Sequence, residues 1–137
     1  TTDADVNHAK KLILLFLLLS LVGCASYQEK KKGIVLDDTL SKYRTAMRWG
    51  RWDSCLSFRD LKAPAVPELD LDNIQVTSYE IRQPPVSTKE DTVLQVVEIQ
   101  YVLRDQQRLR KVYEKQEWRF DAEQKVWRLH SPFPEFQ

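Results

Sequence analysis

The sequence predicts an α+β protein, in which an N-terminal signal helix precedes two short helices packed on a four-stranded antiparallel sheet. Three observations predict this class. A run of apolar residues lies near the N-terminus, apolar residues recur at helical spacing between residues 38 and 58, and the period of the pattern changes from 3.6 to 2 from residue 74 onward. The length of 137 residues supports one domain, which we place at residues 37–137.

The N-terminal segment has the pattern of a secretory signal peptide, which we place at residues 1–23. Lys10 and Lys11 precede an uncharged run from residue 12 to residue 23, in which ten of twelve residues are strongly apolar. A spanning helix needs about 20 apolar residues, so this run alone is too short to cross a bilayer. A positive flank, a short apolar core and small residues at its end match an export signal. The alternative is a buried core helix, which would need a larger protein around it.

Residues 24–36 are predicted to form a tether, followed by a helix that begins at Asp38, because an aspartate can cap free N–H groups. Gly50 is predicted to end this helix, since glycine readily adopts the left-handed conformation. A second short helix follows and ends before Pro64. The inward side chains are expected to be Leu40, Tyr43 and Met47 in the first helix, and Trp52, Cys55, Leu56 and Phe58 in the second.

Four strands are predicted at residues 74–82, 92–103, 108–120 and 125–131, with Pro84 and Pro85 closing the first. Alternation in the second strand groups five side chains on one face: Val93, Val97, Ile99, Tyr101 and Leu103. The charged residues near the second hairpin are expected to be solvated and to form weak ion pairs across the strands. They are Arg104, Arg108, Arg110, Lys111, Glu114 and Glu117.

The end of the apolar run resembles the lipobox of bacterial lipoproteins. Leu21-Val22-Gly23-Cys24 matches this motif, whose last and obligatory residue is the cysteine. The resemblance implies cleavage between Gly23 and Cys24 and a diacylglyceryl thioether on the sulfur of Cys24, so that membrane lipid is the expected partner. Ala25 and Ser26 follow, and the absence of aspartate there resembles an outer-membrane address, with the domain facing the periplasm.

The domain itself is similar to small proteobacterial lipoproteins over about residues 38–136. The similarity is carried by Tyr43, Arg48-Trp49-Gly50, Trp118-Arg119-Phe120-Asp121, Lys125-Val126-Trp127 and Pro134. The order of elements resembles the cystatin-like or nuclear-transport-factor-two-like architecture, which implies a curved sheet around a helix and sometimes a conical pocket. These motifs are structural signatures and imply no reaction.

The composition argues against several classes of function. There are 21 Lys and Arg against 20 Asp and Glu, so the charge gives no indication of nucleic-acid binding. His130 is the one histidine outside the signal segment, which leaves too few ligands for a zinc or iron site. Glycine-rich phosphate loops and a G-x-S-x-G nucleophile motif do not occur. We therefore expect no cofactor, no metal and no enzymatic activity.

Two single residues leave alternatives open. Cys55 is expected to be a buried core thiol, and the alternative is a reactive or intermolecular thiol. His130 follows Leu129, and if Trp127 and Leu129 face the core, the imidazole lies on the solvent side of the strand. The alternative is an acid–base group in a pocket.

The four tryptophans, Trp49, Trp52, Trp118 and Trp127, could form a ligand-stacking cage or supply much of a small core. The core is the favoured interpretation. The tail has a similar ambiguity, because Phe133 and Phe136 alternate with prolines that prevent a continuing strand. They either cover the domain's own core, which we favour, or dock on a partner.

The leading hypothesis is a non-enzymatic binding or scaffolding module anchored to the outer membrane. A second is an accessory subunit of a larger cell-envelope complex, with an envelope protein as partner. A third is a pocket enzyme that uses His130.

Overall fold

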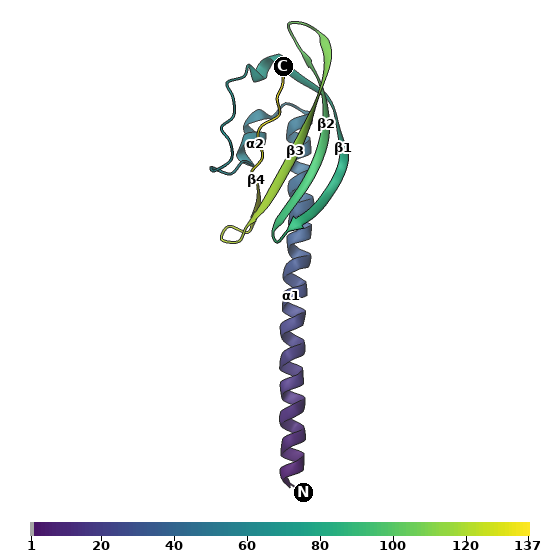
Figure 1. Cartoon of the computed structure of the whole chain (residues 1–137), viewed down its shortest axis with the longest axis vertical. Coiled ribbons are helices and arrows are strands. Elements are labelled where there is room, and N and C mark those ends of the chain that lie inside the picture. Colours follow the sequence, from purple (N-terminus) through teal and green to yellow (C-terminus); the bar gives the residue numbers. More distant parts are fainter. Residues whose placement is uncertain (1) are drawn as a thin grey trace. The chain divides into compact units, whose positions relative to one another are not determined.

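The computed structural model describes residues 2–137, apart from the side chains of Leu21 and Val22, and these two lipobox side chains therefore lie outside the described residues. The chain divides into two compact units, Thr1–Asp37 and Asp38–Gln137. The helices are α1 (Thr2–Arg48), α2 (Trp52–Ser57) and the short 3-10 turn η1 (Leu71–Asn73), and the strands are β1 (Ile74–Lys89), β2 (Thr92–Leu103), β3 (Arg108–Asp121) and β4 (Val126–Leu129) (Figure 1). The predicted α+β class is confirmed.

Helix α1 corrects one prediction, because no helix begins at Asp38; the chain is already helical there, and residues 24–36, which we predict to form a tether, are part of the same helix. The predicted pair of short helices is therefore wrong, since the first is the end of one long helix. The segment contains no proline, and its single Gly33 costs a helix only about 1 kcal/mol. Ion pairs one turn apart support it: Lys32 with Glu29 at 3.3 Å and Lys42 with Asp38 at 2.8 Å.

The end of α1 is as predicted. Gly50 has φ +65°, and its N–H donates to the carbonyl of Met47 at 3.3 Å. The N–H of Arg51 donates to the carbonyl of Ala46 at 2.8 Å. This pair of bonds is the Schellman arrangement, which satisfies carbonyls that the helix leaves free. The chain reverses there and enters α2, where Cys55 is buried as expected.

The four strands form one antiparallel sheet in the order β1-β2-β3-β4. Strand β2 has the predicted bounds, and β3 extends the prediction by one residue. Strand β4 is shorter than predicted and ends at Leu129. Strand β1 continues through Pro84 and Pro85, where its register with β2 shifts. An edge strand tolerates proline because a missing N–H can point away from the ladder.

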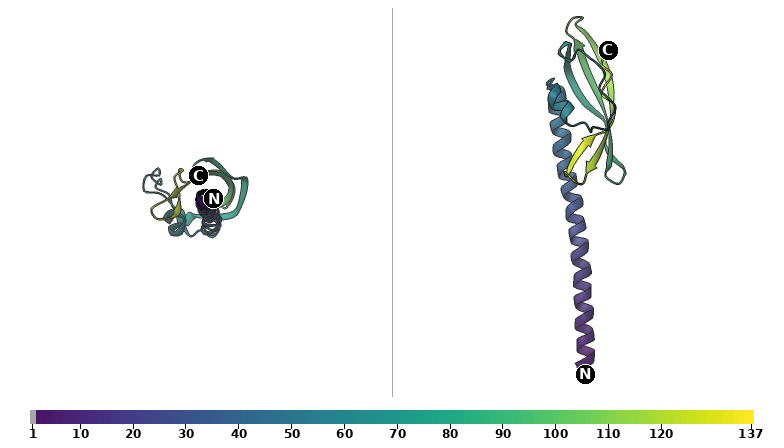
Figure 2. Two further views of the ribbon diagram at one scale, coloured as in Figure 1. Left: turned by 90° about the horizontal axis from the view of Figure 1, so that it is seen from below. Right: turned by 90° about the vertical axis from the view of Figure 1, so that its left-hand side faces the viewer.

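The sheet curves around the last turns of α1 within the second unit (Figure 2). Successive side chains along a strand point to opposite faces of the sheet, so every second side chain lies on the concave face, where the core is. The buried apolar side chains are Tyr43, Ala46 and Met47 from α1, Cys55 from α2, and Ile74, Val76, Tyr79, Val93, Val97, Ile99, Tyr101, Trp118, Trp127 and Leu129 from the sheet.

The C-terminal tail covers the domain's own core, as we favoured from the sequence. Phe133 and Phe136 are 4% and 5% exposed. The ring of Phe136 lies edge-on to Tyr101, with centroids 4.9 Å apart, and 5.8 Å from the ring of Trp52. The N–H of Gln137 donates to the hydroxyl of Tyr101 at 2.8 Å, which holds the end of the chain in place.

Candidate functional site

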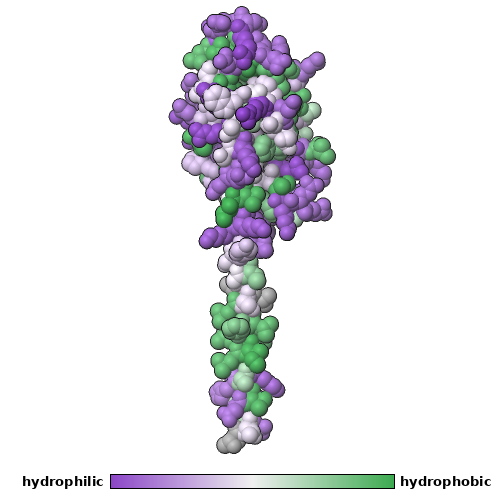
Figure 3. Space-filling view, turned by 180° about the vertical axis from the view of Figure 1, so that it is seen from behind, coloured by the Kyte–Doolittle hydropathy of each residue, from purple (hydrophilic) through white to green (hydrophobic). Residues whose placement is uncertain are grey.

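The first candidate is the apolar segment of α1. Eight consecutive side chains, from Leu12 to Leu19, are between 55% and 77% exposed, and Cys24 is an exposed free thiol further along the same helix. In the space-filling view, apolar side chains gather on this part of the chain, whereas the surface of the sheet-containing unit is largely polar (Figure 3). Such a long run of large apolar side chains is rarely left in water.

Helix α1 is apolar and long enough, by length and composition, to cross a membrane. The apolar run by itself is shorter than a span, but the helix continues beyond it on both sides. A signal sequence near the N-terminus has the same properties. The N-terminal part of α1 is therefore compatible with a signal sequence or with a membrane anchor.

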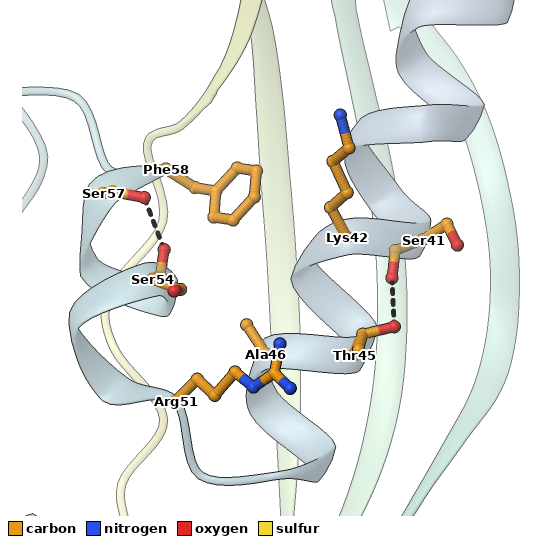
Figure 4. Close-up of a pocket in the computed structure, with 8 residues that line it drawn as sticks. All are labelled: Ser41, Lys42, Thr45, Ala46, Arg51, Ser54, Ser57 and Phe58. Atoms are coloured by element: carbon orange, nitrogen blue, oxygen red, sulfur yellow. Dashed lines mark hydrogen bonds between the residues drawn. The ribbon is translucent and has the colours of Figure 1, made fainter.

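The second candidate is a groove of about 380 Å³ between the last turns of α1 and α2. In Figure 4, side chains from both helices and from the turn between them face this space. Its polar lining consists of four hydroxyl residues and two cations, and its apolar floor is Ala46 and Phe58. The polar lining residues are Ser41, Lys42, Thr45, Arg51, Ser54 and Ser57.

The groove contains one cation with a partner and one without. Lys42 pairs with Asp38 at 2.8 Å. Arg51 makes no side-chain hydrogen bond or ion pair in the part of the chain that the structure describes, and its guanidinium extends beside Ala46 (Figure 4). Thr45 and Ser57 use their hydroxyls to bond helix carbonyls, at 3.0 and 2.6 Å. Chemically, the groove can accept a polar, oxygen-rich group.

The third candidate is a cluster of polar side chains inside the concave face. The hydroxyl of Tyr43 donates to Oε2 of Glu114 at 2.7 Å, and Nε2 of Gln116 donates to the other oxygen, Oε1, at 2.7 Å. Nε2 of Gln116 also reaches the hydroxyl of Tyr79 at 2.9 Å. Its Oε1 accepts from the indole of Trp118 at 2.9 Å and from Gln95 at 3.0 Å. We call these six residues the polar core.

Burial changes the acid–base properties of the polar core. It raises the pKa of the Glu114 carboxyl to about 7, although the hydrogen bonds from Tyr43 and Gln116 and the charge of Arg59 act in the opposite direction. Burial, reinforced by the negative charge of Glu114, also raises the pKa of the Cys55 thiol to about 12. The pKa of Tyr43 is raised for the same two reasons. At neutral pH, Cys55 is therefore a thiol rather than a nucleophilic thiolate.

His130 lies just after β4 rather than within it, and it is less exposed than expected, with 16% of the side chain accessible. Nε2 of His130 is 3.6 Å from Oδ2 of Asp60, in the loop that follows α2. Partial burial lowers the pKa of His130, and the negative charge of Asp60 opposes that shift. The imidazole thus has a structural partner and does not lie on the groove or in the polar core.

The four tryptophans do not form a cage. Trp118 and Trp127 are buried in the sheet, as favoured, and Trp52 is half-buried against the tail. Trp49 contradicts the core interpretation, because it is 67% exposed. One face of its indole is covered by the guanidinium of Arg48, whose central carbon lies 4.6 Å from the ring centroid.

The polar core was missed from the sequence, and Glu114 was wrongly placed on a solvated hairpin. Glu114 and Gln116 alternate with Trp118 along β3, so a buried Trp118 requires all three to point inward. Gln95 sits in the same way between Val93 and Val97 on β2. Alternation would therefore have identified these residues, had their polarity not been taken as a sign of exposure.

The described residues 2–137 contain no group of three or more His, Cys, Asp or Glu side chains that could hold a metal ion. No protein-family model matches this chain, and a search of curated proteins finds no similar sequence.

Proposed function

We propose that this protein is a lipid-anchored, non-enzymatic binding or scaffolding module, attached through Cys24 to the outer membrane and facing the periplasm. Support for the anchor comes from one observation above all, the exposed apolar run from Leu12 to Leu19 that precedes an exposed cysteine. Burying a large apolar side chain stabilises by about 1.5–3 kcal/mol, so inserting these eight side chains into lipid contributes on the order of 10 kcal/mol.

Acylation of Cys24 would then retain the domain after the signal segment is removed. Each buried methylene of an acyl chain contributes about 0.8 kcal/mol, and one chain alone holds a protein only weakly. A diacylglyceryl group supplies two chains. The residues after Cys24 are helical, so the acylated cysteine would be joined to the domain by a helix.

Support for binding rather than catalysis comes from how the reactive side chains are used. His130 lies 3.6 Å from the carboxylate of Asp60, Glu114 bonds with Tyr43 and Gln116, and the Cys55 thiol is buried. The groove between α1 and α2, by contrast, presents hydroxyls and the Arg51 guanidinium to solvent. It is the surface we assign to a polar ligand.

Replacing the thiol of Cys24 tests the anchor, with Cys55→Ser as the matched control. We expect wild type and Cys55→Ser to incorporate a labelled fatty acid and to lose the signal segment, as judged by mass spectrometry. Cys24→Ser should remain unlabelled and uncut. Label retained in Cys24→Ser, or a wild-type protein that is unlabelled yet bound to the membrane, would contradict lipidation and favour an uncleaved helical anchor.

A second candidate is an accessory subunit of a cell-envelope complex, and the exposed Trp49 favours it. Tryptophan and arginine are enriched among the residues that dominate protein interfaces, and here Arg48 lies against the indole. Cross-linking in native membranes should then recover a partner in stoichiometric amount from wild type and not from Trp49→Ala. If no such partner is recovered from wild type, the accessory-subunit candidate is contradicted and the binding-module proposal is retained.

A further inference from the structure

The polar core joins elements that are far apart in the sequence. Tyr43 belongs to the end of α1, Tyr79 to β1, Gln95 to β2, and Glu114 and Gln116 to β3. The bond between Tyr43 and Glu114 is therefore a direct polar connection from the helix to the concave face of the sheet.

Glu114 is in a poor environment for a charge. Its carboxyl receives hydrogen bonds from two neutral groups, Tyr43 and Gln116. The positive charge of Arg59 acts on this carboxyl, but its Nη2 donates to the carbonyl of Pro64 at 2.9 Å, and no hydrogen bond joins Arg59 to Glu114 among the described residues. A buried carboxylate without a hydrogen-bonded cation is strongly disfavoured, and it lowers its free energy by taking up a proton.

We propose that Glu114 is a proton-binding site that makes the packing of the last turns of α1 against the sheet depend on pH. In the protonated form, the carboxyl and the hydroxyl of Tyr43 share a neutral hydrogen bond across 2.7 Å. Release of the proton leaves a buried negative charge that accepts hydrogen bonds from two neutral groups, Tyr43 and Gln116, and the guanidinium of Arg59 offsets this charge only through space. The folded packing of Asp38–Arg48 against the sheet then loses stability, because the cost of burying the charge exceeds the gain from a stronger hydrogen bond between Tyr43 and the carboxylate.

The other titratable groups around Glu114 do not reverse this effect. Tyr43, Tyr79 and Cys55 face it from α1, β1 and α2, and each has a raised pKa, so all three stay neutral across the physiological range. Arg59 faces it from the loop after α2 and stays cationic. The guanidinium carbon of Arg44 lies 6.0 Å from the ring centroid of Tyr79, and its positive charge opposes the rise of the Tyr79 pKa.

The direction of the pH dependence follows from the pKa. The folded value of about 7 lies above the ordinary value of 4.5, so between these values the folded state holds one proton more than the unfolded state. The stabilisation is complete below pH 4.5 and is lost as the pH rises through 7. Across that window, the unfolding equilibrium constant should rise by up to about tenfold per pH unit.

Hydrogen exchange of the full chain in detergent micelles tests the proposal. After correction for the intrinsic exchange rate, protection of amides in Asp38–Arg48 should fall between pH 5 and pH 7 in wild type. It should show a much weaker trend in Glu114→Gln, which keeps a neutral group of the same shape. Glu117→Gln is the matched control, since Glu117 pairs with Arg119 on the other face of β3 and should behave like wild type. His130 is unchanged in wild type and in Glu114→Gln, so its contribution cancels between these two. The charge of Glu117 raises the pKa of His130, so a lower imidazole pKa is the one pH effect expected in the Glu117→Gln control.

A second measurement does not depend on Glu114→Gln being folded. Glutamate labelled with ¹³C at the carboxyl carbon reports each titration by nuclear magnetic resonance. We expect one glutamate to titrate with a midpoint near pH 7 in wild type. The midpoint should be higher in Tyr43→Phe, because the hydrogen bond from Tyr43 lowers the pKa of Glu114 and this variant lacks it. Equal pH trends in wild type and a folded Glu114→Gln, or no glutamate midpoint above about pH 6 in wild type, would overturn the proposal.

Discussion

Truncating Phe136 tests whether the tail is part of the core. The ring of Phe136 is 5% exposed and contacts three aromatic rings. The centroid distances are 4.9 Å to Tyr101, 5.8 Å to Trp52 and 5.9 Å to Phe133. All three contacts are edge-on, which is the favourable arrangement for aromatic pairs.

The expected cost follows from this burial. Replacing a buried phenylalanine with alanine typically costs about 3–5 kcal/mol, because apolar burial is lost and a cavity remains. The tail ends one residue later and can relax, so we expect the lower end, about 3 kcal/mol. In a domain of this size, 1 kcal/mol corresponds to about 4–8 °C, so Phe136→Ala should lower the melting temperature by about 12–24 °C.

Thermal and urea unfolding of the full chain in detergent micelles, followed by near-ultraviolet circular dichroism, measures this cost. Tyr113→Ala is the matched control, since Tyr113 is an aromatic residue of β3 that is 53% exposed. We expect that control to change stability by less than about 0.5 kcal/mol. A cost below about 1 kcal/mol for Phe136→Ala, together with loss of a bound envelope protein, would refute the self-covering tail and restore the docking interpretation.

Two further predictions concern the turn after α1 and the buried thiol. Gly50→Ala should destabilise the domain by about 1 kcal/mol, because φ is +65° at this position and alanine is disfavoured there. Gly33→Ala is the control, since it lies in the interior of α1 and should stabilise the helix. Equal effects of the two substitutions on the free energy of unfolding in urea would contradict this account. In a Cys24→Ser background, where no exposed thiol reacts, Cys55 should react with a maleimide only after unfolding, because it is buried and its pKa is raised to about 12. Rapid labelling of this native variant near pH 7 would show that the Cys55 thiol is accessible.

The sequence was sufficient for the elements whose signal is local. Alternation placed β2 at Thr92–Leu103 and nearly placed β3, because the side chains of a strand point to opposite faces in turn. Gly50 marked the end of α1, since a left-handed residue is needed there. The apolar run from Leu12 to Leu19 could also be identified locally, because eight consecutive apolar residues are visible in the composition of the segment alone.

Non-local effects required the tertiary structure. The prolines of β1 indicate a strand end locally, yet the strand continues because it lies at the edge of the sheet, and strand order is not a local property. Trp49 and Trp118 are the same residue type, but one is exposed and the other has no accessible surface. The difference comes from what packs against each of them.

The polar core shows this division most clearly. From the sequence alone, Glu114 is a charged residue near a basic hairpin, and solvent exposure is the ordinary expectation for it. In the folded domain, Tyr43 arrives from α1, 71 positions earlier in the chain, and donates a hydrogen bond at 2.7 Å. The sequence determined that Glu114 shares a face with Gln116 and Trp118. Only the tertiary structure decided that this face is interior, because burial of a carboxyl group depends on the partners that folding brings to it.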